Sequence, residues 1–424
     1  MTVDAIASEF AHFVTESPTA FHAASVARDR LVAAGFTDLD ETQAWPTEPG
    51  AYVVVRDGAV IAWRLPEGAS ATTPFRILGA HTDSPGFRIK PNPTVRVGGW
   101  EQLNVEVYGG PVLSTWFDRD LRIAGRVVHR DGTTSLFDTV DAVARIPNLA
   151  IHLDRGANDG PALDKQRHTL PIVGTDGSAG VGTGGSDAME WLRSRLGETA
   201  VSWDLFFADT QAPSRIGIDR AFLASGRMDN LTSVHAGLRG LIEAPGDGDH
   251  IPVFAAFDHE EIGSSTPSGA GGPFLEDVLD RVQEGLGATR SEAARAFRAS
   301  WLLSSDAGHL VHPNQPEKHD PTNRPRPGAG PLLKISANQR YMTEAKGEAV
   351  WAAACETAGV PWQPFVNVNT IPGGSTIGPI AATRLGIPTI DIGVGLLSMH
   401  SIRELVHVDD LAALHGAVAA FLAG

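Results

Sequence analysis

The sequence contains a single cysteine, Cys355, among its 424 residues. One thiol cannot close a disulfide within the chain, and it cannot supply the several thiolates of a cysteine-based zinc site. This cysteine usage is typical of a reducing cytosol. Apolar residues make up 42% of the chain, which is enough for a sizeable core without cross-links. We therefore expect an ordinary folded protein of two or three domains.

Basic clusters, long apolar runs and an export signal are also missing. The chain has 34 basic and 50 acidic side chains, a formal net charge of -16 and no dense group of Lys and Arg, so nucleic acid is not an expected partner. No apolar run approaches the roughly 20 residues needed to cross a bilayer. Residues 1–31 show helical spacing of apolar residues instead of the segments of a signal peptide. We expect a cytoplasmic protein with no membrane partner.

Short apolar runs, each followed by a polar cluster, recur along the chain. Four of them have the length and composition of buried strands: 75–80 before "HTDSPG", 253–257 before "DHEEIGS", 301–303 before "SSDAGH" and 389–394 before "GLLSMHS". Helical spacing is found between and after them at 230–243, 274–284, 291–298, 344–358 and 409–421. Strands that alternate with helices predict an α/β fold, a central mixed sheet flanked by helices. Ligands bind such sheets at the carboxyl ends of the strands, where the polar clusters fall.

Residues 92–213 have a different pattern of apolar and polar residues from the rest of the chain. Alternating stretches such as "TVRVGG", "NVEVYGG" and "RIAGRVVHR" are typical of strands and predict a β-rich insertion in a main domain of residues 1–91 and 214–424. The glycine-rich run at 174–187 lacks the Lys-Ser/Thr ending of a phosphate-binding loop and is interpreted as a flexible loop. The segment 314–331 has too much proline for regular structure.

The first polar cluster, "GAHTDSPGF", contains His81 and Asp83. A histidine at a strand end is more often a packed or surface residue than a ligand. A carboxylate two residues further on can accept a hydrogen bond from the second imidazole nitrogen and orient the ring, which favours a metal ligand. Asp229, in "GRMDNLTSVHAGL", precedes a helical pattern, so its alternative role is that of a helix N-cap.

Adjacent carboxylates, Glu260 and Glu261, follow the second strand. They could be a solvated pair at a strand edge, but like charges beside a buried strand repel unless a cation compensates them. With a divalent metal, one carboxylate can coordinate while the other takes a proton from water as a general base. Asp306 and His400 follow the remaining apolar strands in the same manner.

These positions provide two imidazoles and three carboxylates as candidate ligands, besides the general base. Oxygen and imidazole donors without thiolate suit Zn, Mn or Co. Five ligands are too many for one four-coordinate zinc with an open position. They suit two metals roughly 3.5–4 Å apart that share a carboxylate and a water.

In combination the motifs resemble the aspartyl aminopeptidase family of cocatalytic-metal exopeptidases over nearly the whole chain. The motifs that carry this resemblance are, in order, "SPTAFHA", "HTDSPGFRIKP", "WFDRDLRIAGRV", "MDNL", "HEEIGS", "DAGHLVHPN", "NQRY", "GGSTIGPI" and "MHSIRE". The resemblance implies a zinc-exopeptidase-like catalytic domain, an insertion at 92–213 that mediates dimerisation, and a homododecamer. It also implies peptide substrates and two bound divalent ions per subunit, with Zn expected.

The resemblance further assigns roles to the candidate residues. Asp229 would bridge the metals, with His81 and Asp306 completing one site and Glu261 and His400 the other. Glu260 would be the general base, and Asp83 would orient the His81 ring.

Substrate selection depends on two further positions. In the resembled family Lys334 matches a lysine that holds an acidic N-terminal side chain, and His309 matches a histidine near the substrate carbonyl; a solvated loop charge is the alternative for Lys334. The loop "FVNVNTIPGGSTIGPI" has Asn367, Asn369 and Thr370 where charged residues occur in other members. Lys334 predicts an aminopeptidase for N-terminal Asp or Glu. The uncharged loop makes a preference for neutral residues one alternative. A related two-metal carboxypeptidase or amidohydrolase, or a shell protein without activity, are others.

Overall fold

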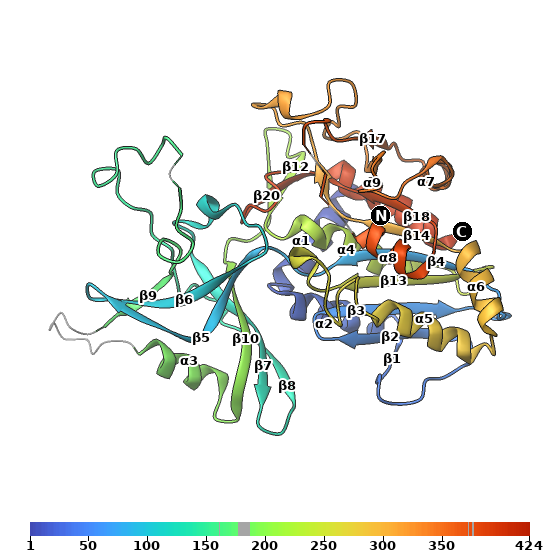
Figure 1. Ribbon diagram of the computed structural model, residues 1–424, viewed down its shortest axis with the longest axis horizontal. Coiled ribbons are helices and arrows are strands. Elements are labelled where there is room, and N and C mark those ends of the chain that lie inside the picture. The colour runs from blue at the N-terminus through green and yellow to red at the C-terminus, as the bar shows by residue number, and fades with distance from the viewer. Residues whose placement is uncertain (161, 177–186, 372, 375–376) are drawn as a thin grey trace. The chain divides into compact units, whose positions relative to one another are not determined.

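The structure, a computed structural model, describes residues 1–160, 162–176, 187–371, 373–374 and 377–424. The chain divides into two compact units (Figure 1). The first contains Met1–Asp83, Pro213–Met399 and Glu404–Gly424, and the second contains Ser84–Ala212 and His400–Arg403.

A nine-stranded sheet forms the centre of the first unit within the described residues. Its order is β1 (Thr37–Asp38), β2 (Gly50–Arg56), β3 (Ala59–Leu65), β13 (Ile251–Phe257), β4 (Phe75–His81), β14 (Trp301–Ser305), β18 (Thr389–Gly393), β16 (Leu332–Lys334) and β17 (Gln363–Phe365). The four middle strands, β13, β4, β14 and β18, run parallel to one another, whereas β3 and β16 run antiparallel to them. The polar clusters that follow β13, β4 and β14 therefore gather at one edge of the sheet, as the sequence predicts.

Helices cover both faces of this sheet (Figure 1). One face packs against α1 (Val3–Glu16), α2 (Ala20–Ala33), α4 (Met228–Glu243), α7 (Ala345–Ala358) and α9 (Val408–Ala423), and the other against α5 (Phe274–Gly285), α6 (Arg290–Ala299) and α8 (Ile377–Leu385). Side chains of a strand alternate between its faces, so Leu78 and Ala80 of β4 point into the first core and Phe75 and Ile77 into the second. The predicted mixed α/β fold flanked by helices is confirmed.

The same unit contains a five-stranded sheet, one strand of which directly precedes α4 in the chain. It consists of β11 (Ser214–Ile216), β12 (Phe222–Ser225), β20 (Glu404–His407), β19 (Gly395–Leu397) and β15 (Gly308–His309). Strand β12 ends shortly before α4 begins, and Ser225 pairs with Glu404 of β20. This register sets Glu404 beside the first turn of α4.

Within its described residues, the second unit is built on a six-stranded antiparallel sheet. Its order is β8 (Thr134–Asp138), β7 (Leu121–His129), β10 (Ala200–Asp209), β5 (Gly86–Val97), β6 (Trp100–Tyr108) and β9 (Ile172–Thr175), accompanied by α3 (Ala188–Leu196). This unit begins at Ser84 rather than at 92 and includes His400–Arg403, because β5 pairs with β6 from Gly86 onward and buries Phe87 in its core. Most of the glycine-rich run at 174–187 lies outside the described residues. None of the described helices is long and apolar enough to cross a membrane.

Candidate metal centre

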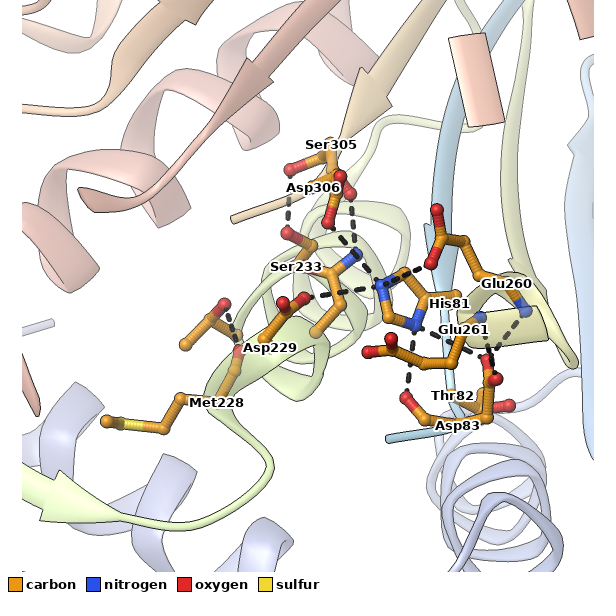
Figure 2. A network of polar contacts seen from close by, with 12 residues as sticks. His81, Thr82, Asp83, Met228, Asp229, Ser233, Glu260, Glu261, Ser305 and Asp306 are labelled. Atoms are coloured by element: carbon orange, nitrogen blue, oxygen red, sulfur yellow. Dashed lines mark hydrogen bonds and ion pairs between the residues drawn. The ribbon is translucent and has the colours of Figure 1, made fainter. Parts of the chain in front are cut away.

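The ring of His81 lies at the centre of a group of carboxylates (Figure 2). It ends β4 and is 1% exposed. Its Nδ1 lies 3.0 Å from the backbone oxygen of Asp83, to which it donates a hydrogen bond. Its Nε2 lies 3.3 Å from Oδ1 of Asp229, 3.4 Å from Oδ1 of Asp306 and 3.9 Å from Oε2 of Glu260. With the proton on Nδ1, the lone pair of Nε2 faces these carboxylates and can bind a metal.

Asp83 holds the segment that carries the paired glutamates. Its Oδ1 and Oδ2 accept hydrogen bonds from the backbone N–H groups of Glu260 and Glu261, each at 3.1 Å. These glutamates begin the short 3-10 helix η2 (Glu260–Ile262), which follows β13. The Asp83 carboxylate also lies 3.4 Å from Nδ1 of His81. The Asp83 carboxylate therefore lies beside His81, while its shorter contacts go to the backbone N–H groups of Glu260 and Glu261; its role as the orienting partner of His81 stays a prediction.

Asp229 and Asp306 approach from α4 and from the end of β14. The backbone N–H groups of Met228 and Asp229 donate to Oε2 of Glu404 at 2.7 and 3.1 Å. The assigned N-cap of α4 is Arg227, but the backbone angles of Asp229 and Asn230 are non-helical, so the regular helix begins after them and the N-cap alternative for Asp229 is not contradicted. Glu404 belongs to the motif "MHSIRE", but no local sequence pattern relates it to Asp229, which is far away in the chain.

Burial and mutual repulsion set the ionisation of the site. Burial, reinforced by neighbouring carboxylates, raises the pKa of Glu260 to about 7 and raises the pKa of Glu261 well above its ordinary value. For His81, burial lowers the pKa, but hydrogen bonds with Asp229, Asp306 and Asp83 outweigh it and raise the pKa well above the ordinary value. Such a cluster favours a bound cation, because a cation stabilises the ionised carboxylates. Both glutamates are half-buried, which disfavours the alternative of a solvated pair.

Among the described residues of the first unit, two sets of side chains have the geometry for metal ligation. His81, Asp229 and Asp306 form one set, and His81, Glu260 and Glu261 form the other; in each set one ligand atom per residue lies within 4.8 Å of the others. These donors are imidazole and carboxylate only, which suits zinc and similar divalent ions. The residues present therefore fit a metal centre at the edge of the central sheet.

Comparison with known proteins identifies the family. The model described as "Aminopeptidase I zinc metalloprotease (M18)" matches residues 13–422. The chain belongs to the M18 aminopeptidase family. A "Probable M18 family aminopeptidase 2" from Streptomyces avermitilis is 50% identical over 419 residues, which cover 97% of this chain and 96% of the relative. The expected resemblance to the aspartyl aminopeptidase family is confirmed, because the M18 family includes aspartyl aminopeptidase-like members.

Solved structures of M18 proteins share the fold. The chain in "Cryo-EM structure of the Ape4 and Nbr1 complex" has a TM-score of 0.93 and 32% identity, over 99% of this chain and 86% of that one. The chain in "Structure of S. cerevesiae mApe1 dodecamer" has a TM-score of 0.83 and 27% identity, over 98% of this chain and 96% of that one. These similarities span both units of this M18 aminopeptidase.

His400 is the one predicted ligand that belongs to the second unit. Its Nδ1 lies 3.1 Å from the backbone oxygen of Gly110 in that unit. The role of His400 in metal binding stays a prediction.

The two predicted substrate residues of this M18 enzyme occupy different environments. Lys334 ends β16 and is 1% exposed, with its Nζ 3.3 Å from Oδ2 of Asp306 and 5.3 Å from the ring centre of Tyr341. Burial lowers its pKa, but the charge of Asp306 outweighs this and raises it. The alternative of a solvated loop charge is therefore wrong. His309, in β15, lines a cavity of about 260 Å³ together with Tyr341 and Phe365.

Proposed function

We propose that this M18 aminopeptidase removes N-terminal Asp or Glu from peptides, with Glu260 as the general base. The observation that carries the proposal is the placement of Glu260. Its carboxylate lies beside His81 and its backbone N–H is held by Asp83. A general base must lie within reach of the water whose proton it takes, and Glu260 lies at the same edge of the sheet as the candidate ligands.

We further propose that two divalent ions bind per subunit, zinc in the first instance and Mn or Co as alternatives. Asp229 would be shared, with His81 and Asp306 completing one site, and Glu261 with His400 the other. When bound, the ions supply Lewis acidity, which polarises the scissile carbonyl and lowers the pKa of water. The set formed by His81, Asp229 and Asp306 supports the first of these sites, and the description of the family as zinc metalloproteases supports zinc as the ion.

The chain's own residues divide the remaining work. Glu260 takes a proton from the attacking water and returns it to the amine that leaves. Asp83 holds Glu260 through the backbone, so that the carboxylate keeps its position during both proton transfers. His309, which lines a cavity together with Tyr341 and Phe365, would donate to the substrate carbonyl as negative charge develops on it.

The test of the mechanism is the substitution Glu260→Gln. We expect it to leave zinc content unchanged and to reduce kcat by about 1000-fold or more, because it removes the general base without removing a ligand. The exposed Glu356→Gln variant in α7 is a matched control and should retain full activity. Full hydrolysis by purified Glu260→Gln would contradict the assignment.

The preference for acidic residues is tested through Lys334. If its ammonium group holds the substrate carboxylate, Lys334→Met should lower kcat/KM for N-terminal Asp and Glu about 10–100-fold more than for Leu. A second candidate function, cleavage of neutral N-terminal residues, is favoured by the contact between Lys334 and Asp306. In that case the wild type prefers Leu, and Lys334→Met affects all three substrates equally.

Assembly belongs to the same proposal. We infer a homododecamer built from dimers, in which the second unit mediates dimerisation. A dodecameric relative supports it, as does the group of exposed apolar side chains Leu149, Ile151 and Leu153 on the second unit. Light scattering coupled to size-exclusion chromatography measures the assembly directly. Replacing the three apolar residues with Ser should yield smaller particles.

A further inference from the structure

Glu404 is a buried carboxylate at the start of β20, with 3% of its surface exposed. One of its oxygens, Oε2, accepts the backbone N–H groups of both Met228 and Asp229. These contacts join residues that are far apart in the chain. The carboxylate thus binds the backbone of a proposed metal ligand.

The start of α4 needs an external acceptor at this place. The first N–H groups of a helix have no partner within it and are usually satisfied by the side chain of the N-cap residue. Here the N-cap is Arg227, whose left-handed backbone, with φ 59°, is accompanied by no capping hydrogen bond from its side chain, and the backbone angles of Asp229 and Asn230 are also non-helical. Glu404 supplies the missing acceptor, and its negative charge complements the positive end of the helix.

A second contact joins the start of α4 to the end of β14, which precedes Asp306. The amide Nδ2 of Asn230, which is fully buried, donates to the backbone oxygen of Ser305 at 2.8 Å. Ser305 directly precedes Asp306 (Figure 2). The backbone of Asp229 is therefore held between Glu404 and the residue next to Asp306.

We propose that Glu404 is a positioning residue: it fixes the backbone at Asp229 so that the Asp229 carboxylate faces His81 and Asp306 in the arrangement that binds metal. This inference rests on the proposed metal centre. Partners that orient metal ligands typically contribute 10–100-fold to metal affinity. Glu404 should act on zinc affinity without touching the ion.

Asp410 provides a matched control within the same unit. It is also a buried carboxylate, and it accepts two backbone N–H groups, from Gly328 at 2.8 Å and from Gly330 at 2.7 Å. None of these residues belongs to the candidate ligand sets. Loss of Asp410 removes the same kind of contact, and hence stability, at a place that holds no ligand.

The experiment measures zinc affinity, by competition with a chromogenic chelator, and thermal unfolding of the zinc-free protein. We expect Glu404→Ala to weaken zinc binding about 10–100-fold and Asp410→Ala to leave it unchanged, although both lower Tm. Glu404→Gln keeps an acceptor oxygen but loses the charge, so it should bind zinc about 3–10-fold more weakly than wild type. If Glu404→Ala does not fold, the comparison of Glu404→Gln with Asp410→Asn decides the matter.

Each result has a distinct meaning. Unchanged zinc affinity in the folded Glu404 variants overturns the positioning role and leaves the proposed function intact. An equal loss of affinity in the Asp410 variants also overturns it, because stability alone would then explain the effect. A wild-type protein that binds no zinc overturns the metal centre itself.

Discussion

At the residue scale, Asp83 contacts more than the imidazole ring of His81. Both of its carboxylate oxygens accept backbone N–H groups, those of Glu260 and Glu261. It connects the end of β4 to the turn after β13, two strand ends that the parallel pairing of Phe257 with His81 already brings together. The general base and its neighbour are therefore positioned from the adjacent strand.

The backbone N–H groups of Glu260 and Glu261 each need an acceptor oxygen of Asp83. The substitution Asp83→Asn replaces one of the two oxygens with an NH₂ group, which cannot accept. We expect kcat to fall about 10–100-fold and the free energy of unfolding to fall by about 1–3 kcal/mol. Steady-state kinetics and thermal unfolding measure the two effects. Asp131→Asn, at a turn where Asp131 accepts the N–H of Thr133, is the control and should retain activity. An Asp83→Asn enzyme as active as wild type would show that the N–H contacts have no catalytic weight.

Sequence patterns identified the residues around His81, but not the contacts between distant strands that hold other site residues in position. His81, Asp229, Glu260, Glu261 and Asp306 each follow a buried strand or open a helix, and the structure brings all five together. The roles of Glu404 and Lys334 depend instead on pairing between distant strands, β20 with β12 and β16 with β18. A local pattern carries no information about such register.

At the scale of elements, α1, α4 and α9 enclose a buried pair of imidazoles. Nδ1 of His235 lies 2.9 Å from Nε2 of His415, and the rings of Phe10 and Phe13 lie 5.6 and 5.5 Å from the His235 ring. Burial lowers the pKa of both histidines, and that of His415 falls well below its ordinary value. Glu9 faces His235 at 3.5 Å, and its attraction does not offset burial.

This pair makes stability depend on pH. Because both pKa values are lowered in the folded state, the unfolded chain takes up protons first as the pH falls below about 6.5. The stability of the packing is full above that pH and declines below it. We expect Tm to drop between pH 7.5 and 5.5, and to drop less in a His235→Gln/His415→Gln variant. The exposed His12→Gln is the control, and an equal drop in all three proteins would contradict the assignment.

Close packing of α4 against the sheet gives another prediction. A Cβ atom at Gly237 would lie 2.1 Å from Cδ2 of Leu78 and 2.6 Å from Cδ2 of Phe254. Gly237→Ala should therefore destabilise the protein by about 1–3 kcal/mol through overpacking. At Gly416, in α9, the nearest atom would lie 3.5 Å away, and Ala there should stabilise by up to about 1 kcal/mol. Denaturant titration of both variants measures the difference, and two shifts of the same sign would contradict it.

Periodicity sufficed for most elements of the first unit. The predicted strands at 75–80, 253–257 and 301–303 are found as β4, β13 and β14 with ends shifted by a few residues. In the second unit the sequence indicated strands correctly, but it did not indicate α3, and its boundary at 92 differs from the observed one. Residues 86–91 alternate like any strand, and only their pairing with β6 assigns them to the second sheet.

At the scale of the whole molecule, charge links the metal centre to stability. The chain carries a formal net charge of -16, and several of its carboxylates are buried together around His81. Ions that bind only the folded state add stability by mass action, about 4 kcal/mol when free metal is 1000 times Kd. Removal of metal by a chelator should lower Tm by several degrees, as calorimetry can measure, and zinc should restore it. An unchanged Tm would contradict a metal centre of that affinity.

The fold class of the whole chain could be predicted because strands and helices alternate at local spacing. The division into two units could be predicted only in outline, since the second unit takes a short segment, His400–Arg403, from far along the chain. A segment of four residues that belongs to an earlier unit is too short to change the composition or periodicity of the sequence around it. Its place in that unit is a property of the tertiary structure alone.

The order of strands in the central sheet also has a consequence for synthesis on the ribosome. Strand β4 lies between β13 and β14, and the whole of Ser84–Ala212 is translated before either neighbour exists. Until then β4 is an apolar strand with two unpaired edges, the kind of segment that associates with other chains. The nascent chain must therefore be shielded through the translation of the second unit, and the ability to capture zinc would mark the moment when its folding is complete.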